Sequence, residues 1–366
     1  MEFHFIFLFY ILFLIISTIG SGLLFSNIIN PRFKNYNLGY QGILGIFFIT
    51  FISVLSSFFI KHGYAHNIIL HSVNVTFFTY MLFKKKINYN ELKKILILVL
   101  ILLIGIYIYK THDDFPYYHL TYSLNLSQNS ISIGQGAFSH GFRTYSSIFY
   151  LNSTFYLPGI NFYLFNLGQF LILLFFNFIL LNKVFENLKE KKINLVFYLA
   201  LFCLAFVDVV FYRIGEHGTD RSAQILLFLI FILLIEILLD KKNKIFSYEF
   251  LLLIVIYSAS LKSIYAIYLI LIIFLIYEKK CFFELIKSTN LKFISIICFA
   301  FLMNFLINFL NTGCLLYPEE RTCIEKFEWS IPKQEVKELK IHYEWWAKAG
   351  GGPSYKSKMK KEEYVK

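Results

Sequence analysis

Long apolar runs separated by short polar connections dominate the pattern of this 366-residue chain. A run of about 18–20 apolar residues is long enough to cross the hydrocarbon core of a bilayer as an α-helix. The pattern predicts an all-α, polytopic transmembrane protein with about ten membrane segments. We expect these segments near residues 5–29, 41–60, 66–83, 92–109, 158–182, 193–212, 221–239, 247–261, 264–277 and 291–310.

The composition supports an integral membrane protein with the lipid bilayer as its surroundings. The chain is 57% hydrophobic and 16% charged, and its mean hydropathy is +0.61, whereas a soluble domain is about 25% charged. The net charge of +12 comes largely from lysines that cluster between the apolar runs, as the positive-inside rule describes. No nucleic-acid partner is therefore predicted.

The lysine clusters predict which connections face the cytoplasm. If every segment crosses once, all of the clusters lie inside, and the N-terminus, residues 110–157, residues 213–220 and the chain from 311 onward lie outside. This assignment requires a hairpin within 247–277, where polar residues around Lys262 interrupt the apolar run. The clusters are Lys84, Lys85, Lys86, Lys93 and Lys94; Lys183, Lys189, Lys191 and Lys192; Lys241, Lys242 and Lys244; and Lys279, Lys280 and Lys287.

The topology divides the chain into two predicted parts. Residues 1–310 form the transmembrane domain, in which 110–157 is an aromatic-rich outer loop with helices at the membrane surface. Residues 311–366 form an outer polar segment, interpreted as a soluble tail or as the beginning of a part that a longer protein would continue.

An acidic pair carries the strongest chemical signal. Asp113 and Asp114 directly follow an apolar segment, and ionisable groups at that depth mark functional sites by default. One carboxylate is predicted to act as a general base towards an acceptor hydroxyl. The other would orient the first or hold a divalent cation, Mg²⁺ or Mn²⁺; no other cofactor is predicted. The alternative is that the pair caps a helix beginning at Phe115-Pro116.

Further ionisable residues gather in the predicted outer connections. Arginine binds phosphate through a planar fork, and the loop between the segments ending at 212 and beginning at 221 is dense in charge. The alternatives are a solvated turn with a helix cap for that loop, and snorkelling to the surface for Lys262. The candidate substrate- and phosphate-binding residues are His112, His119, His140, Arg143, Arg213, His217, Asp220, Arg221 and Lys262.

Two of the five cysteines frame a short segment in the last outer part. Cys314 and Cys323 are candidates for a disulfide, provided that this segment faces an oxidising compartment. Such a bond would close and stiffen a small loop.

The acidic pair at the outer end of a membrane helix resembles a feature of the C-type membrane glycosyltransferases, which use polyprenyl-phosphate-linked sugars. Tyr118-His119 and Gly141-Phe142-Arg143 are similar to the interfacial helices of their outer loops. The sequences Gly218-Thr219-Asp220 and Gly313 to Pro318 resemble motifs of bacterial membrane proteins of this type. One departure is that about four apolar segments precede the pair here, whereas in many members the pair follows the first membrane helix.

The resemblance implies a reaction at the outer face of a bacterial inner (plasma) membrane. Asp113 or Asp114 would deprotonate a glycan, lipid or protein acceptor, whose oxygen attacks the anomeric carbon with inversion. The leaving lipid phosphate would lie near Arg213 or Arg221. Two other functions stay open: a polymerase or ligase of surface polysaccharide, and a flippase or transporter of a lipid-linked saccharide. A transporter predicts internal repeats and several mid-membrane charges. The sequence supports neither the repeats nor the charges.

Overall fold

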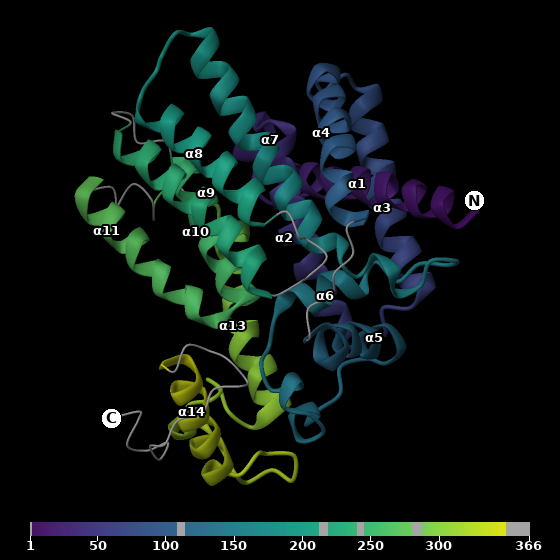
Figure 1. Ribbon diagram of the computed structural model, residues 1–366, viewed down its shortest axis with the longest axis vertical. Helices are drawn as coiled ribbons and strands as arrows, with labels where there is room; N and C mark the ends of the chain where they lie inside the picture. The colour runs from purple at the N-terminus through teal and green to yellow at the C-terminus, as the bar shows by residue number, and fades with distance from the viewer. Residues whose placement is uncertain are drawn as a thin grey trace. The chain divides into compact units, whose positions relative to one another are not determined.

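The computed structural model describes residues 2–107, 114–211, 219–239, 245–279, 287 and 289–348. The chain forms two compact units, which Figure 1 shows within one ribbon. Unit 1 comprises Met1–Ile131 and Ser146–Phe301, and unit 2 comprises Ser132–Tyr145 and Leu302–Lys366. Within the described ranges the chain is helical and contains no β-strand, so the predicted all-α class is confirmed.

Most of the helices belong to unit 1. They are α1 (Glu2–Ile28), α2 (Leu38–Ser57), α3 (Tyr64–Phe83), α4 (Tyr89–Tyr107), α5 (Leu120–Gln128), α6 (Ser147–Ser153), α7 (Leu167–Lys189), α8 (Leu195–Val210), α9 (Thr219–Leu239), α10 (Ile245–Leu261) and α11 (Leu269–Lys279). Helix α13 (Leu291–Thr312) begins in unit 1 and ends in unit 2, which also contains α14 (Lys333–Lys348).

Five helical stretches in the described residues are long and apolar enough to cross a membrane. The apolar helices α8, α10 and the one that spans Ser263–Glu278 are shorter. Helices α3 and α4 are not among these candidates. The chain is therefore an α-helical membrane protein, whereas the predicted number of ten membrane segments is not confirmed. The five stretches are His4–Ile28, Leu38–Ser57, Phe162–Lys189, Thr219–Leu239 and Leu291–Thr312.

Helix α3 nevertheless has the surface pattern of a helix in lipid. Its polar residues Asn67, His71 and Asn74 are buried, whereas Ile69 and Val73 are 64% and 54% exposed. A helix of a soluble protein shows the reverse arrangement, with its apolar stripe against the core. The polar face of α3 packs on α1, where the Ser17 hydroxyl and His71 Nδ1 lie 2.8 Å apart.

Hydrogen bonds link the helix ends of unit 1 in two separate groups. At the ends that carry the described lysines of the clusters, Asn290 donates to the Ile29 carbonyl, and Arg32 pairs with Glu249 at 2.7 Å. At the opposite ends, the backbone of Ile131 donates to that of Ser57. We call these the lysine end and the Asp114 end.

The long apolar run 247–277 is interrupted where its polar residues predicted a break. Helix α10 ends at Leu261, Lys262 is extended, and a 3₁₀ turn at Ser263–Tyr268 leads into α11. The side chain of Lys262 forms an ion pair with Asp220 in the first turn of α9. The break therefore lies at the Asp114 end of unit 1.

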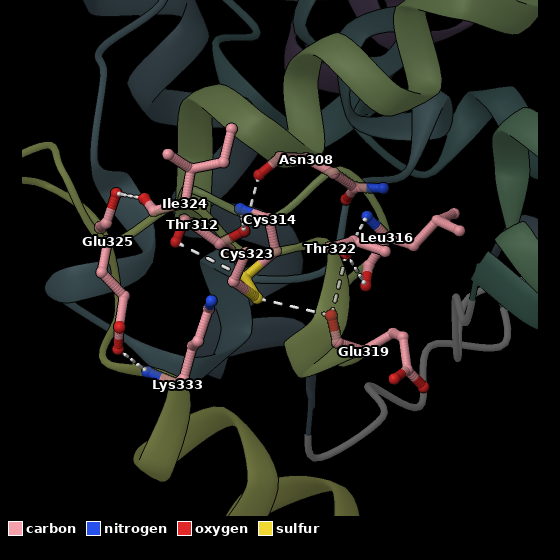
Figure 2. Close-up of a disulfide and its surroundings, with 11 residues drawn as sticks. Asn308, Thr312, Cys314, Leu316, Glu319, Thr322, Cys323, Ile324, Glu325 and Lys333 are labelled. Carbon is pink, nitrogen blue, oxygen red and sulfur yellow. Dashed lines mark hydrogen bonds between the residues drawn. A yellow bond between two sulfur atoms is a disulfide. The ribbon is translucent and has the colours of Figure 1, made fainter.

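Unit 2 has its own small core around a disulfide. Cys314 and Cys323 are bonded, and both are buried together with Ile331 and Val336. Figure 2 shows that hydrogen bonds of threonine side chains to nearby backbone groups surround the bond. Gly313 enters this turn with φ +79°, and a Cβ there would lie 2.3 Å from the Ser330 hydroxyl, so only glycine fits.

The first prediction concerns this disulfide. Replacing Cys314 and Cys323 together with serine is expected to destabilise unit 2 by about 2–3 kcal/mol, because the bond restricts the unfolded chain. The change in stability would be measured as the urea concentration at which a protease begins to cleave α14. The free, exposed Cys298 provides the control variant Cys298→Ser. Equal midpoints for both variants would show that the bond contributes no stability.

Candidate functional site

A helix beginning beside Asp114 forms one wall of the candidate site. A π turn over Phe115–His119 runs directly into α5, and π turns are frequent at functional sites. The half-buried Asp114 makes no capping hydrogen bond to this helix, although the Tyr118 hydroxyl donates to its carboxylate at 3.4 Å. Capping therefore does not explain Asp114. The neighbouring candidates His112 and Asp113 lie outside the described residues.

A small polar cavity lies against this helix, wholly within unit 1. Its volume is about 10 Å³, close to the roughly 10–15 Å³ that one buried water molecule needs. The cavity can therefore hold one water molecule or one hydroxyl group. The lining residues come from the π turn, α5, α6, the chain before α7, α7 and α9: Phe115, His119, Ser123, Ile148, Phe149, Asn152, Phe165, Asn166, Gln169 and Thr219.

Four side-chain oxygen atoms in the lining have no hydrogen-bond partner among the described residues. They are Ser123 Oγ, Asn152 Oδ1, Asn166 Oδ1 and Gln169 Oε1, and all four are buried. Leaving such a group unpaired costs about 1–3 kcal/mol, so native proteins rarely do so. Four of them around one cavity indicate a place built to receive hydrogen bonds from a water molecule or a bound ligand.

Local sequence positions these atoms. Asn166 stands before α7 at the capping position but makes no capping bond, which leaves its side chain to the cavity. Gly168 makes room for Asn152, because a Cβ at that glycine would lie 2.5 Å from Asn152 Oδ1. Helix α6 is anchored to the end of α10, since the Ser146 hydroxyl donates to the Leu261 carbonyl at 2.7 Å.

Two of the predicted binding residues come together near this cavity. Thr219 lines the cavity, Asp220 follows it in the chain, and Lys262 pairs with Asp220. Both partners of this ion pair remain partly exposed, at 44% and 41% for the side chains of Asp220 and Lys262. The structure therefore gives Lys262 a carboxylate partner. The sequence predicts phosphate binding or snorkelling for this residue, and the ion pair is a third role.

Of the remaining predicted arginines and histidines that the structure describes, only His119 lines the cavity. Arg221 lies half-buried in the first turn of α9, and His119 lines the cavity against Phe149, with ring centroids 5.5 Å apart. Arg213 and His217 lie outside the described residues. His140 is exposed in unit 2.

Arg143 has an internal role in unit 2. Its guanidinium donates to the Gly136 carbonyl at 2.8 Å and pairs with Glu335 of α14 at 2.7 Å. Burial lowers the pKa of Arg143, but the neighbouring Tyr317 and Glu335 raise it by more, so the group stays charged. These contacts hold the segment 132–145 against α14, and phosphate binding by Arg143 stays a prediction.

A histidine network beside α3 escaped the sequence reasoning. His62 Nδ1 lies 2.6 Å from the Ser153 hydroxyl, and Asn67 donates to three backbone carbonyls. Burial, with a smaller effect of His66, lowers the pKa of His62 to about 3, so the ring is neutral. The spacing of Asn67, His71 and Asn74 on one helical face is the signal that could have indicated a buried polar contact.

Among the described residues, no group of three or more histidine, cysteine, aspartate or glutamate side chains gathers with the spacing of a metal site. The predicted divalent cation rests on Asp113 and Asp114, of which only the second is described. The cation therefore stays a prediction.

The chain belongs to the family described as "Domain of unknown function (DUF8201)", whose model matches residues 5–361. This match covers most of both units. No curated protein matches the chain, and no solved structure matches it.

Proposed function

We propose that this protein is an integral-membrane glycosyltransferase that moves a sugar from a polyprenyl-phosphate donor to an acceptor at the membrane surface. The observation that carries the proposal is the cavity at the Asp114 end, with four buried oxygen atoms that have no hydrogen-bond partner among the described residues. Sugars are rich in hydroxyl donors, and a cavity of this size admits one such hydroxyl. The exposed sugar would then lie beside Asp114, the described carboxylate of the acidic pair.

The reaction is a single displacement. The Asp114 carboxylate removes the proton of the acceptor hydroxyl, and the acceptor oxygen forms a bond to the anomeric carbon. The bond between that carbon and the phosphate oxygen breaks at the same time, and the lipid phosphate leaves with its electron pair. Attack from the opposite side inverts the anomeric configuration. Arg221 is the described arginine nearest in sequence to the cavity-lining Thr219, and it would stabilise the leaving phosphate.

The proposal places the Asp114 end on the outer face of a bacterial inner membrane. Lysine clusters are retained in the cytoplasm, and the described lysines of these clusters lie at the other helix ends of unit 1. The disulfide of unit 2 is typical of an oxidising compartment. The N-terminus would then also lie outside.

Surface glycans of cells with and without the protein test the function. We expect deletion to remove one sugar from a surface glycan, as seen by mass spectrometry, and to cause its polyprenyl-phosphate donor to accumulate. Restoring the wild-type gene should reverse both changes. Accumulation of complete lipid-linked repeats would instead indicate a polymerase, ligase or flippase. Unchanged glycans and unchanged lipid-linked sugars would overturn the proposal.

A matched pair of serines tests the role of the cavity. Ser123→Ala is expected to raise the KM for the donor about fivefold to tenfold, since it removes one hydrogen-bonding group worth about 1 kcal/mol. Ser127, one turn later, is also buried, but its hydroxyl already donates to the Ser123 carbonyl at 2.9 Å. Ser127→Ala should leave the KM unchanged. Equal KM values for both variants and wild type would remove the cavity from the mechanism.

A further inference from the structure

A second, larger cavity lies in unit 1, between α4 and α7. Its volume is about 250 Å³, and its lining repeats at helical spacing along both helices. Four lining residues at such spacing span about 10 Å of helix. The lining residues are Lys94, Ile97, Leu98 and Ile101 of α4, and Phe178, Leu181, Asn182 and Phe185 of α7.

The walls of this cavity, which we call the groove, are apolar. The groove opens towards the surroundings of the helices. Ile97, Ile101 and Phe185 are 49%, 61% and 55% exposed. In a membrane protein, side chains exposed in this way on two neighbouring helices face lipid. The groove therefore offers an apolar channel that a hydrocarbon chain of the bilayer can enter.

Two polar groups distinguish the groove from an ordinary lipid-facing surface. Asn182 is 7% exposed, and its Nδ2 has no hydrogen-bond partner among the described residues. The ammonium group of Lys94 lies over the Phe185 ring, 5.8 Å from its centroid, and it makes no ion pair with a described carboxylate. An unpaired amide donor and a cation thus accompany an apolar channel at the lysine end.

Charge complementarity identifies the occupant. Lys84, Lys85, Lys86 and Lys93 precede Lys94 closely in the chain, and basic residues beside a membrane attract anionic lipids. A phosphodiester would supply the negative charge for Lys94, and ester oxygens of the glycerol would accept a hydrogen bond from Asn182. An acyl chain would fill the space along Ile97, Leu98 and Phe178.

We infer that the groove between α4 and α7 is a binding site for an anionic phospholipid of the leaflet that holds the lysine clusters. One acyl chain lies between the two helices, the phosphate pairs with Lys94, and Asn182 donates to the lipid backbone. This site lies at the lysine end, whereas the candidate catalytic cavity lies at the Asp114 end. The inference therefore does not depend on the proposed function.

Lipid retention measures this site directly. The purified protein would be placed in phosphatidylcholine nanodiscs containing a minor fraction of phosphatidylglycerol, and the lipid that survives detergent extraction would be counted by native mass spectrometry. Wild type is expected to retain one phosphatidylglycerol. Lys94→Gln should weaken retention about fivefold, the usual effect of one basic residue at a membrane surface. Asn182→Leu, which keeps the branched shape and the number of heavy atoms but removes the amide donor, should also weaken retention.

The neighbouring lysine supplies the matched control. Lys93 is exposed and does not line the groove, so Lys93→Gln should retain the lipid as wild type does. Equal losses for both lysine variants would show general surface attraction and overturn the site. Displacement of the lipid by soluble glycerol phosphate would mean that an anion, without a chain, is bound. Retention of phosphatidylcholine in equal amount would also contradict the inference.

Discussion

Replacing Asp114 with asparagine is expected to lower sugar transfer by about 10²–10⁴-fold, the range that a positioned general base contributes. The amide has the same shape but cannot take the acceptor proton. The fold should tolerate the change, because Asp114 makes no capping bond and the Tyr118 hydroxyl can donate to an amide oxygen as well as to a carboxylate. Protein level and helix content should therefore match those of wild type.

Transfer would be measured in membranes with a labelled polyprenyl-phosphate sugar. Asp208→Asn supplies a control, since this carboxylate accepts a hydrogen bond from Asn177 at 2.6 Å and does not line the cavity. A parallel Asp113→Asn variant identifies which member of the pair is the base. If both members of the pair can be replaced without loss of transfer, neither acts as the base, and the proposed mechanism fails.

The sequence is a good guide to helices whose pattern is purely apolar. The runs that became α2, α7 and α9 were visible because lipid-facing and protein-facing positions are both apolar in a membrane. Even the break at Lys262 could be expected from its polar neighbours. The predicted segment 92–109 corresponds to α4, which is not among the candidate membrane spans, because Glu91, Lys93 and Lys94 occupy its first turns.

The candidate site depended on contacts that no local pattern contains. Asn152, Asn166 and Gln169 are ordinary polar residues in the sequence, and only the packing of α6 against α5 and α7 places their oxygens around one cavity. Arg143 shows the opposite case. Its residue type suggested phosphate binding, but its partner, Glu335, lies in a distant helix. Long-range pairing therefore decides the role of such a charged side chain, because its neighbours in the sequence do not determine that role.

The packing of α1 on α2 leads to the second large expected effect. Gly45→Val is expected to destabilise unit 1 by about 3 kcal/mol or more, at or above the usual cost of overpacking. A Cβ at Gly45 would lie 1.8 Å from the Thr18 carbonyl oxygen, and one at Gly22 would lie 1.8 Å from the Gln41 carbonyl oxygen. Each glycine therefore faces the backbone of the other helix. Small residues permit such close approach between membrane helices.

The clash cannot be relieved by a side-chain movement, because the obstructing atoms belong to a helical backbone. The two helices must separate, and separation disturbs the hydrogen bond of Ser26 to Gln41 across the same interface, which measures 2.7 Å. Monodispersity in detergent and the thermal midpoint would report the loss. Gly63→Ala is the control, since the nearest atoms to a Cβ there lie 3.7 Å away, in ordinary contact. A Gly45→Val protein as stable as Gly63→Ala would mean that α1 and α2 do not approach this closely.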